Sequence, residues 1–170
     1  FFHPWRTTLP WMRAARALET ESEQPVFTDP FARELAGDVG FSIFTRTQGA
    51  SGAVTQGRNP YLSIRTKFLD DAIQKAVREN GYTQLVILAA GMDTRAFRLE
   101  WPAGLTIFEV DRSDVFEWKE PILERLKASP TCNRRVLRTD LTGDWTGALT
   151  SAGFDPSKPT AFLVEGLLMY

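Results

Sequence analysis

The sequence predicts an α/β protein built on a doubly wound parallel β-sheet. Three observations indicate this fold: short apolar runs without alternation, amphipathic stretches between them, and an acid or a glycine turn at the end of each run. Unbroken apolar runs are typical of strands buried on both faces, and their alternation with helices favours parallel strands joined by right-handed crossovers. Ligands bind such sheets beyond the carboxyl ends of the strands, so we look for chemistry there.

The N-terminal part of the chain is predicted to be helical over residues 10–37. The first helix is marked by an apolar stripe of Trp11, Met12, Ala15 and Leu18. Residues 1–16 carry three arginines and no acid, which is faintly typical of a targeting remnant, but the interleaved aromatic residues favour an amphipathic helix. Asp29 and Pro30 have the residue types of an N-cap and a first helical position, and Gly37 follows the end of this second helix.

Small and polar residues fill positions 47–60, which predicts a loop that is either a mobile lid or a plain surface linker. Apolar positions then recur at helical spacing over residues 61–79, and Asn80 with Gly81 ends that helix. We expect residues 1–80 to form a helical cap with a helix leading into the core. Residues 81–170 would then form the α/β domain.

Four strands are predicted within the α/β part, at residues 85–90, 105–110, 135–138 and 161–164. A helix is predicted over residues 113–126. Ser113 is its expected N-cap, and Pro121 is expected to kink it or divide it into two pieces.

The strands end in Gly91-Met92-Asp93, Asp111, Asp140 and Glu165, and a parallel sheet gathers these ends along one edge. Asp111 follows Gly91 by 20 positions (111 − 91) and ends the next strand. Nucleotide-binding α/β folds place there the acid that accepts hydrogen bonds from ribose hydroxyls. The alternative is an N-cap for the following helix, a role for which Ser113 competes.

The turn after the first strand argues against dinucleotides. It contains one glycine, Gly91, whereas a pyrophosphate site needs G-x-G-x-x-G, and Asp93 would repel a phosphate. A nucleoside without phosphates fits this turn better than NAD or ATP. Arg65, on the helix before the first strand, could clamp a carboxylate with two hydrogen bonds, although a solvent-facing role is the alternative.

Composition excludes several classes of partner. The net charge is −1, with 20 basic and 21 acidic residues, so no overall field favours nucleic acid or an anionic membrane, and no apolar run reaches transmembrane length. The single cysteine, Cys132, fits a reducing compartment, and we expect a cytoplasmic protein; organellar targeting stays open because the sequence begins at Phe1. No metal-binding spacing is visible, and the only histidine, His3, favours a structural role over that of a base.

Several stretches resemble the leucine carboxyl methyltransferase family, a group that also holds bacterial polyketide O-methyltransferases. They are ILAAGMDTRAFR at 87–98, FEVD at 108–111, Thr139-Asp140-Leu141 and VEGLLMY at 164–170, with residues 29–32 and 64–71 fitting upstream. The resemblance spans nearly the whole chain in the family's order. One departure is Ala89, which stands where the leucine carboxyl branch has the first glycine of a Gly-x-Gly turn.

The resemblance implies a class I methyltransferase fold that binds S-adenosyl-L-methionine. It implies that Ala89 and Gly91 form the cofactor turn and that Arg65 holds the cofactor carboxylate. It further implies that Asp111 holds the ribose, Asp140 and Leu141 flank the adenine, and Glu165 contacts the methionine amino end. The family fold has seven strands, so we expect the sheet to be truncated after the fourth, with an uncovered edge that invites self-association.

The predicted activity is methyl transfer to an oxygen, a carboxylate or a hydroxyl, of a small molecule or of a protein C-terminus. No residue is assigned as a catalytic base. One alternative is a catalytically inactive binding module on the same fold, because fold does not guarantee function. A third possibility, a nicotinamide-dependent oxidoreductase, is disfavoured by the missing glycines.

Overall fold

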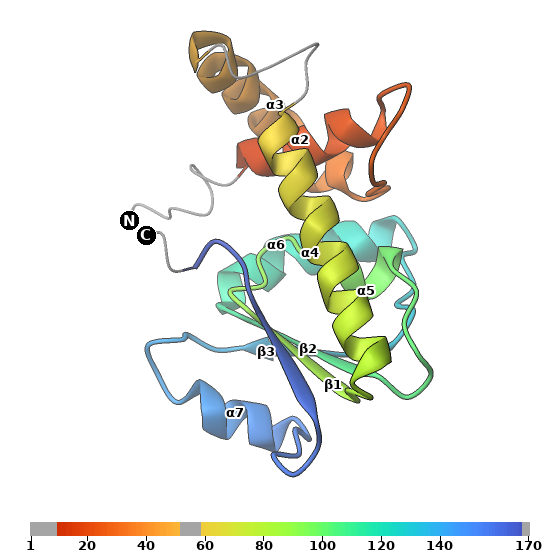
Figure 1. Ribbon diagram of the computed structural model, residues 1–170. Coiled ribbons are helices and arrows are strands. Elements are labelled where there is room, and N and C mark those ends of the chain that lie inside the picture. The colour runs from red at the N-terminus through yellow and green to blue at the C-terminus, as the bar shows by residue number, and fades with distance from the viewer. Residues whose placement is uncertain (1–9, 52–58, 168–170) are drawn as a thin grey trace. The chain divides into compact units, whose positions relative to one another are not determined.

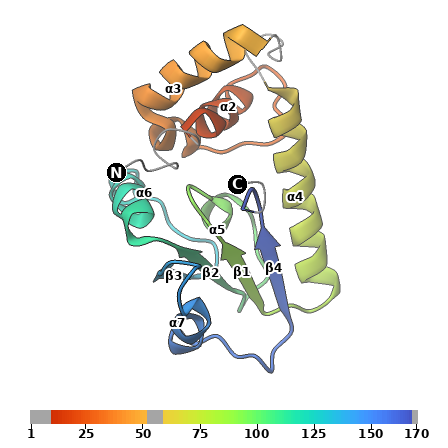
Figure 2. The same ribbon diagram turned by 90° about the vertical axis from the view of Figure 1, so that its left-hand side faces the viewer.

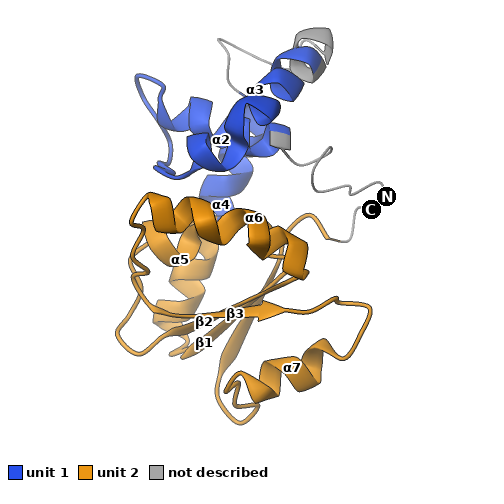
Figure 3. Cartoon of the chain, turned by 180° about the vertical axis from the view of Figure 1, so that it is seen from behind, with its two compact units in different colours: residues 1–69 blue, residues 70–170 orange. Residues whose placement is uncertain are grey.

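The computed structural model describes the backbone of residues 10–51 and 59–167 and the side chains of residues 11–46 and 59–167. The chain divides into two compact units, residues 1–69 and 70–170 (Figure 3). His3, most of the predicted 47–60 loop and the last three residues of the VEGLLMY stretch lie outside the described residues. None of the described helices is long and apolar enough to cross a membrane.

The described residues of the first unit form helices (Figure 1), which confirms that the chain is helical where residues 10–37 and 61–79 were predicted to be. They are α2 (Pro10–Thr20), α3 (Ala32–Ser51) and the first half of α4 (Pro60–Glu79). Oδ1 of Asp29 accepts the N–H of Phe31 at 3.2 Å, a contact of the capping type predicted for it, but α3 begins at Ala32 and not at Pro30. Gly37 interrupts α3 with a non-helical backbone (φ 57°), but the helix resumes and continues to Ser51, into the segment predicted as a loop.

A small apolar core holds the helices of this unit together. Its fully buried members are Ala14, Ala15, Ala36, Phe44 and Leu62, and the predicted stripe residues Trp11, Met12 and Leu18 pack against them. Small alanines on α2 allow close approach of the neighbouring helix.

The second unit contains a four-stranded, all-parallel sheet (Figure 2). Its strands are β1 (Gln84–Leu88), β2 (Thr106–Asp111), β3 (Asn133–Arg138) and β4 (Thr160–Val164), in the order β3-β2-β1-β4. Leu88 at the end of β1 is in register with Val110 of β2 and with Val164 of β4. The carboxyl ends of these strands therefore share one edge, and the strand order reverses between β1 and β4.

Helices cover both faces of the sheet, as the doubly wound prediction requires. The short α5 (Arg95–Arg98) and α6 (Ser113–Arg125) lie on one side, and α7 (Trp145–Ser151) lies on the other (Figure 3). The core on the α7 side consists of Val86, Phe108, Val110, Leu137 and Leu149. Apolar pattern alone predicted neither α5 nor α7, because helices of four and seven residues show too few turns for a period.

The structure departs from the predictions for α6 at its N-cap and in its continuity past Pro121. Ser113 is not the N-cap: Arg112 occupies that position, without a capping side-chain hydrogen bond. Pro121 does not interrupt the helix, which runs on to Arg125. The carbonyl of Glu117 loses the N–H of Pro121, but Glu117 is exposed, so water can replace that hydrogen bond.

Candidate cofactor site at the carboxyl edge of the sheet

Asp111 and Gly91, predicted as the centre of the site, are hydrogen-bonded to each other. The backbone N–H of Gly91 donates to Oδ2 of Asp111 at 2.7 Å, and the N–H of Arg112 donates to Oδ1 at 2.8 Å. Burial raises the pKa of the Asp111 carboxyl, and these two N–H groups oppose that rise. The carboxylate is thus held in a defined orientation between the ends of two neighbouring strands.

The turn after β1 is built from left-handed residues. Ala89 has φ 51° and Gly91 has φ 50°, while Ala90 continues the ladder by donating its N–H to the carbonyl of Val110 at 3.1 Å. A left-handed conformation costs an alanine about 1 kcal/mol more than a glycine. Ala89 therefore holds, at a cost in backbone strain, a conformation that glycine adopts more readily.

Asp140 and Leu141 follow β3 beside Asp111, because the N–H of Thr139 donates to the backbone carbonyl of Asp111 at 2.9 Å. Asp140 is exposed and accepts the N–H of Thr142 at 2.8 Å; this hydrogen bond lowers the pKa of its carboxyl. Leu141 packs against the apolar core on the α7 side. The structure therefore places both residues at the same edge as Asp111.

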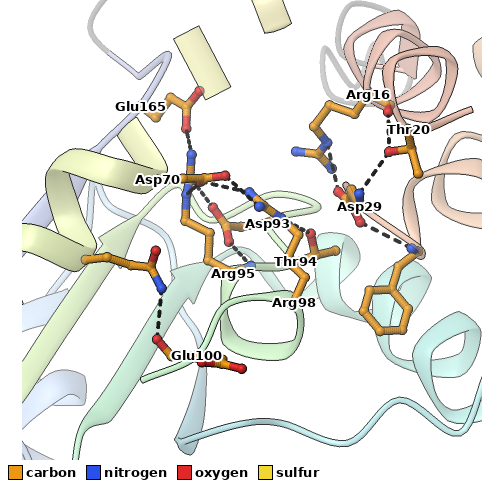
Figure 4. A network of polar contacts seen from close by, with 12 residues as sticks. Arg16, Thr20, Asp29, Asp70, Asp93, Thr94, Arg95, Arg98, Glu100 and Glu165 are labelled. Atoms are coloured by element: carbon orange, nitrogen blue, oxygen red, sulfur yellow. Dashed lines mark hydrogen bonds and ion pairs between the residues drawn. The ribbon is translucent and has the colours of Figure 1, made fainter. Parts of the chain in front are cut away.

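Glu165, directly after β4, is held by a residue that the sequence analysis did not single out. Arg95 binds it through Nη2, at 2.9 Å from Oε2 (Figure 4). The same guanidinium binds Asp70 through Nε at 2.7 Å and Asp93 through Nη1. We call this group the edge network; its members are Asp70, Asp93, Arg95, Arg98 and Glu165.

The edge network changes the interpretation of Asp93. Burial raises the pKa of the Asp93 carboxyl, but Arg95, Lys119 and the backbone N–H of Arg95 lower it to about 2. Burial lowers the pKa of Arg95, but Asp93, Glu165 and Asp70 together raise it. Because Arg95 neutralises Asp93, the argument against a phosphate ligand depends on the single glycine rather than on this charge.

A second ionic cluster, the inner network, lies between β2, α6 and β3. Glu109 and Lys119 are completely buried and 2.6 Å apart, and Arg134 binds both Glu109 (2.7 Å) and Glu120 (2.7 Å). The one sequence signal for it was a charged residue, Glu109, inside the apolar run of β2. We define the inner network as Glu109, Lys119, Glu120 and Arg134.

Arg65 and Cys132 are two further residues that the sequence singled out. Arg65 is a half-buried residue of α4 in the first unit, so its assignment to the cofactor carboxylate stays a prediction. Burial, assisted by Glu109, raises the pKa of the Cys132 thiol to about 11, so this cysteine is protonated at neutral pH and unsuited to nucleophilic work. In the described part of the chain, no group of three or more His, Cys, Asp or Glu residues could hold a metal ion.

Residues 11–170 match the sequence profile of the leucine carboxyl methyltransferase family. Three mycobacterial relatives carry the name "Putative S-adenosyl-L-methionine-dependent methyltransferase" and align with 96% of this chain. The protein of Mycolicibacterium smegmatis (strain mc(2)155) is 44% identical over 57% of its own length, and that of Mycobacterium avium (strain 104) is 40% identical over 57% of its length. The protein of Mycobacterium tuberculosis (strain H37Rv) is 44% identical over 49% of its length. The chain thus spans about half the length of these relatives.

Proposed function

Because this chain belongs to the leucine carboxyl methyltransferase family, whose members use S-adenosyl-L-methionine, we propose that it binds this cofactor at the carboxyl edge and serves methyl transfer to an oxygen. The observation that carries the proposal is the Asp111 carboxylate, fixed by the N–H of Gly91 at the end of β2. Its position beside β1 is where doubly wound sheets hold a ribose.

Asp111 has the chemistry that a ribose requires. A carboxylate offers about four lone-pair sites, and the two backbone N–H groups described above use two of them. The remaining capacity suits the two vicinal hydroxyls of a ribose. Asp140 and Leu141, an exposed acceptor beside a half-buried aliphatic side chain, suit the amino group and the ring of an adenine.

The amino-acid end of the cofactor carries a carboxylate and an ammonium group, and the chain offers a residue for each. We assign the ammonium group to Glu165 at the end of β4. We assign the carboxylate to Arg65, because a guanidinium binds a carboxylate through two parallel hydrogen bonds. The contacts of Asp111 support the ribose assignment directly, whereas that of Arg65 depends on family resemblance.

The bound cofactor supplies a methyl group on a sulfonium, and the residues of the chain hold it in line with an acceptor oxygen. Alignment and exclusion of water contribute most to the rate of such a transfer. A carboxylate acceptor is ionised at neutral pH and needs no base, whereas a phenol or an alcohol needs one. We propose a small molecule or a protein C-terminus as the acceptor.

Substitution of Asp111 tests the site. Titration calorimetry with S-adenosyl-L-homocysteine should show a Kd about 10- to 100-fold higher for Asp111→Ala than for the wild type, because hydrogen bonds to a charged acceptor are lost. The matched control is Asp144→Ala: Asp144 also accepts a backbone N–H, that of Gly147 at 2.9 Å, but it caps α7. An unchanged Kd in Asp111→Ala would contradict the assignment.

The acceptor class is distinguished by the product. With a radiolabelled methyl donor, transfer to a carboxylate gives an ester that mild alkali releases as methanol, whereas transfer to a hydroxyl gives a stable ether. We expect label in the product and, for a carboxylate acceptor, a rate that stays flat as pH rises through neutrality. Cofactor binding without transfer by the chain or by a full-length form would support the inactive binding module instead.

We also propose a cytoplasmic location and self-association through β4. β4 ends the strand order and carries exposed Phe162 and Val164, and an uncovered apolar edge strand favours pairing with another chain. Sedimentation at increasing protein concentration tests the association.

A further inference from the structure

Arg95 joins three segments of the second unit through one buried side chain. It is 4% exposed, and it binds Asp70 of α4, Asp93 of the turn after β1 and Glu165 after β4 (Figure 4). A guanidinium has five N–H donors in a rigid fork, which lets it orient several carboxylates at once. The position of Glu165 is therefore coupled to the turn that contains Gly91.

This coupling spans the place where the strand order reverses. β1 pairs with β2 on one side and with β4 on the other, and Leu88 faces Val110 and Val164 in register. Ligands of doubly wound sheets bind at this reversal. Arg95 thus holds the β4 side of the site, while the Gly91–Asp111 hydrogen bond holds the β2 side.

The ion pairs described for the edge network join more carboxylates than guanidinium groups. Two guanidinium groups, those of Arg95 and Arg98, face three carboxylates, so the five residues carry a formal charge of −1. Glu165 is its most accessible member, 22% exposed, against 4% for Asp70 and 7% for Asp93. Glu165 is therefore the carboxylate of this network that a cationic ligand group can reach.

We propose that Arg95 is a positioning residue of the cofactor site: it orients Glu165 to receive the ammonium group of the methionine moiety. This inference rests on the proposed function. Arg95 itself does not touch the cofactor in this arrangement. Arg95 affects cofactor affinity only by orienting Glu165. A buried arginine that merely stabilises the fold would have no such specific effect on affinity.

The test combines two variants and two ligands. Arg95→Lys keeps the charge but loses the fork, and we expect the Kd for S-adenosyl-L-homocysteine to rise about tenfold. The Kd for 5′-methylthioadenosine, which lacks the amino-acid moiety, should change less than about twofold, since its contacts are to the Asp111 side. When Glu165 is already replaced by Gln, adding Arg95→Lys should raise the Kd for S-adenosyl-L-homocysteine less than about twofold further. The carboxylate through which Arg95 acts is then absent.

Arg134→Lys is the matched control, because it alters a buried guanidinium with two carboxylate partners in the inner network. It should lower the melting temperature and leave both Kd values unchanged. If Arg95→Lys fails to fold, Asp70→Asn takes its place, since it loosens Arg95 without removing the guanidinium; a smaller rise in the same Kd is expected.

Equal losses for both ligands, or multiplicative losses in the double variant, would overturn the positioning role while the proposed function stands. An unchanged Kd for S-adenosyl-L-homocysteine in Arg95→Lys would do the same. Failure of the wild type to bind either ligand is a different result: it would overturn the proposed function and the inference with it.

Discussion

The edge network and the inner network both join basic and acidic side chains of the second unit, yet they differ in charge balance. The inner network pairs two carboxylates with two cations, and its central pair, Glu109 and Lys119, is completely buried. The edge network has one more carboxylate than it has guanidinium groups, and Glu165 is partly accessible. Accessibility does not separate the two networks, because the side chain of Glu120 is 32% exposed and that of Glu165 is 22% exposed. The sharing of cations does: Glu109 pairs with Lys119 and Glu120 with Arg134, whereas Glu165 shares the Arg95 guanidinium with Asp70 and Asp93.

The two networks are not electrostatically independent. The charge of Lys119 lowers the pKa values of both Asp93 and Asp111, which lie at the carboxyl edge. Lys119 of the inner network therefore favours the ionised form of the Asp93 and Asp111 carboxyls, although its own ion pair is with Glu109.

The largest expected effect is on the inner network. Lys119→Met removes one of the two cationic partners of the fully buried Glu109 carboxylate and leaves Arg134 as the other. We expect the free energy of unfolding to fall by about 3 kcal/mol in urea denaturation. The double variant Lys119→Met/Glu109→Leu should recover much of that loss, because no charge is then left uncompensated at this position. A loss below about 1 kcal/mol in the single variant, as for an exposed ion pair, would contradict the expected cost of breaking the buried Glu109–Lys119 pair.

An exposed ion pair on the same helix provides the control. Arg112 and Asp114 are 2.8 Å apart, but their side chains are 39% and 27% exposed. Asp114→Asn should therefore change the free energy of unfolding by less than about 1 kcal/mol. A comparable loss in Lys119→Met and Asp114→Asn would mean that burial does not distinguish these pairs.

A smaller effect is expected from the acid titration of Asp93. Its pKa in the folded protein is about 2, below the usual value of 3.8, so its contribution is present above pH 4 and is lost as the pH falls towards 2. At about 1.4 kcal/mol per pKa unit, the contribution is about 2 kcal/mol. The difference in unfolding free energy between the wild type and Asp93→Asn should narrow by this amount between pH 5 and pH 2.

The measurement compares the wild type with Asp93→Asn because the pKa of Asp111 is shifted in the opposite direction to that of Asp93. Burial raises its pKa, so its ionisation costs folded-state stability as the pH rises, and it partly masks Asp93 in the wild-type curve alone. Parallel stability curves for wild type and Asp93→Asn would show that Arg95 does not depress the pKa of Asp93.

The placement of Gly91 and Asp111 at one edge was predictable because strand periodicity and the residues that end each strand are local properties. The Leu85–Leu88 run, its closing Gly91 and the spacing to Asp111 placed both residues at one edge, and the Gly91–Asp111 hydrogen bond confirms their proximity. The N-cap of α6 was not predictable in this way, since Ser113 has the right residue type but the chain enters the helix at Arg112. The backbone of Ala89 was not predictable from its residue type either, because alanine disfavours the left-handed conformation that it adopts here.

Residue pattern therefore sufficed for the parallel sheet, the edge that carries the acids and the family. The residue pattern did not reveal that Asp93 forms an ion pair with Arg95. Nor did it reveal that Arg95 also binds Asp70 and Glu165, which lie 25 and 70 positions away (95 − 70 and 165 − 95). Pairings over such distances depend on how strands are ordered in the sheet. The sequence shows the sign of each charged side chain but not its partner. The partner is fixed by the tertiary structure, because burial removes the water that would otherwise solvate the charge.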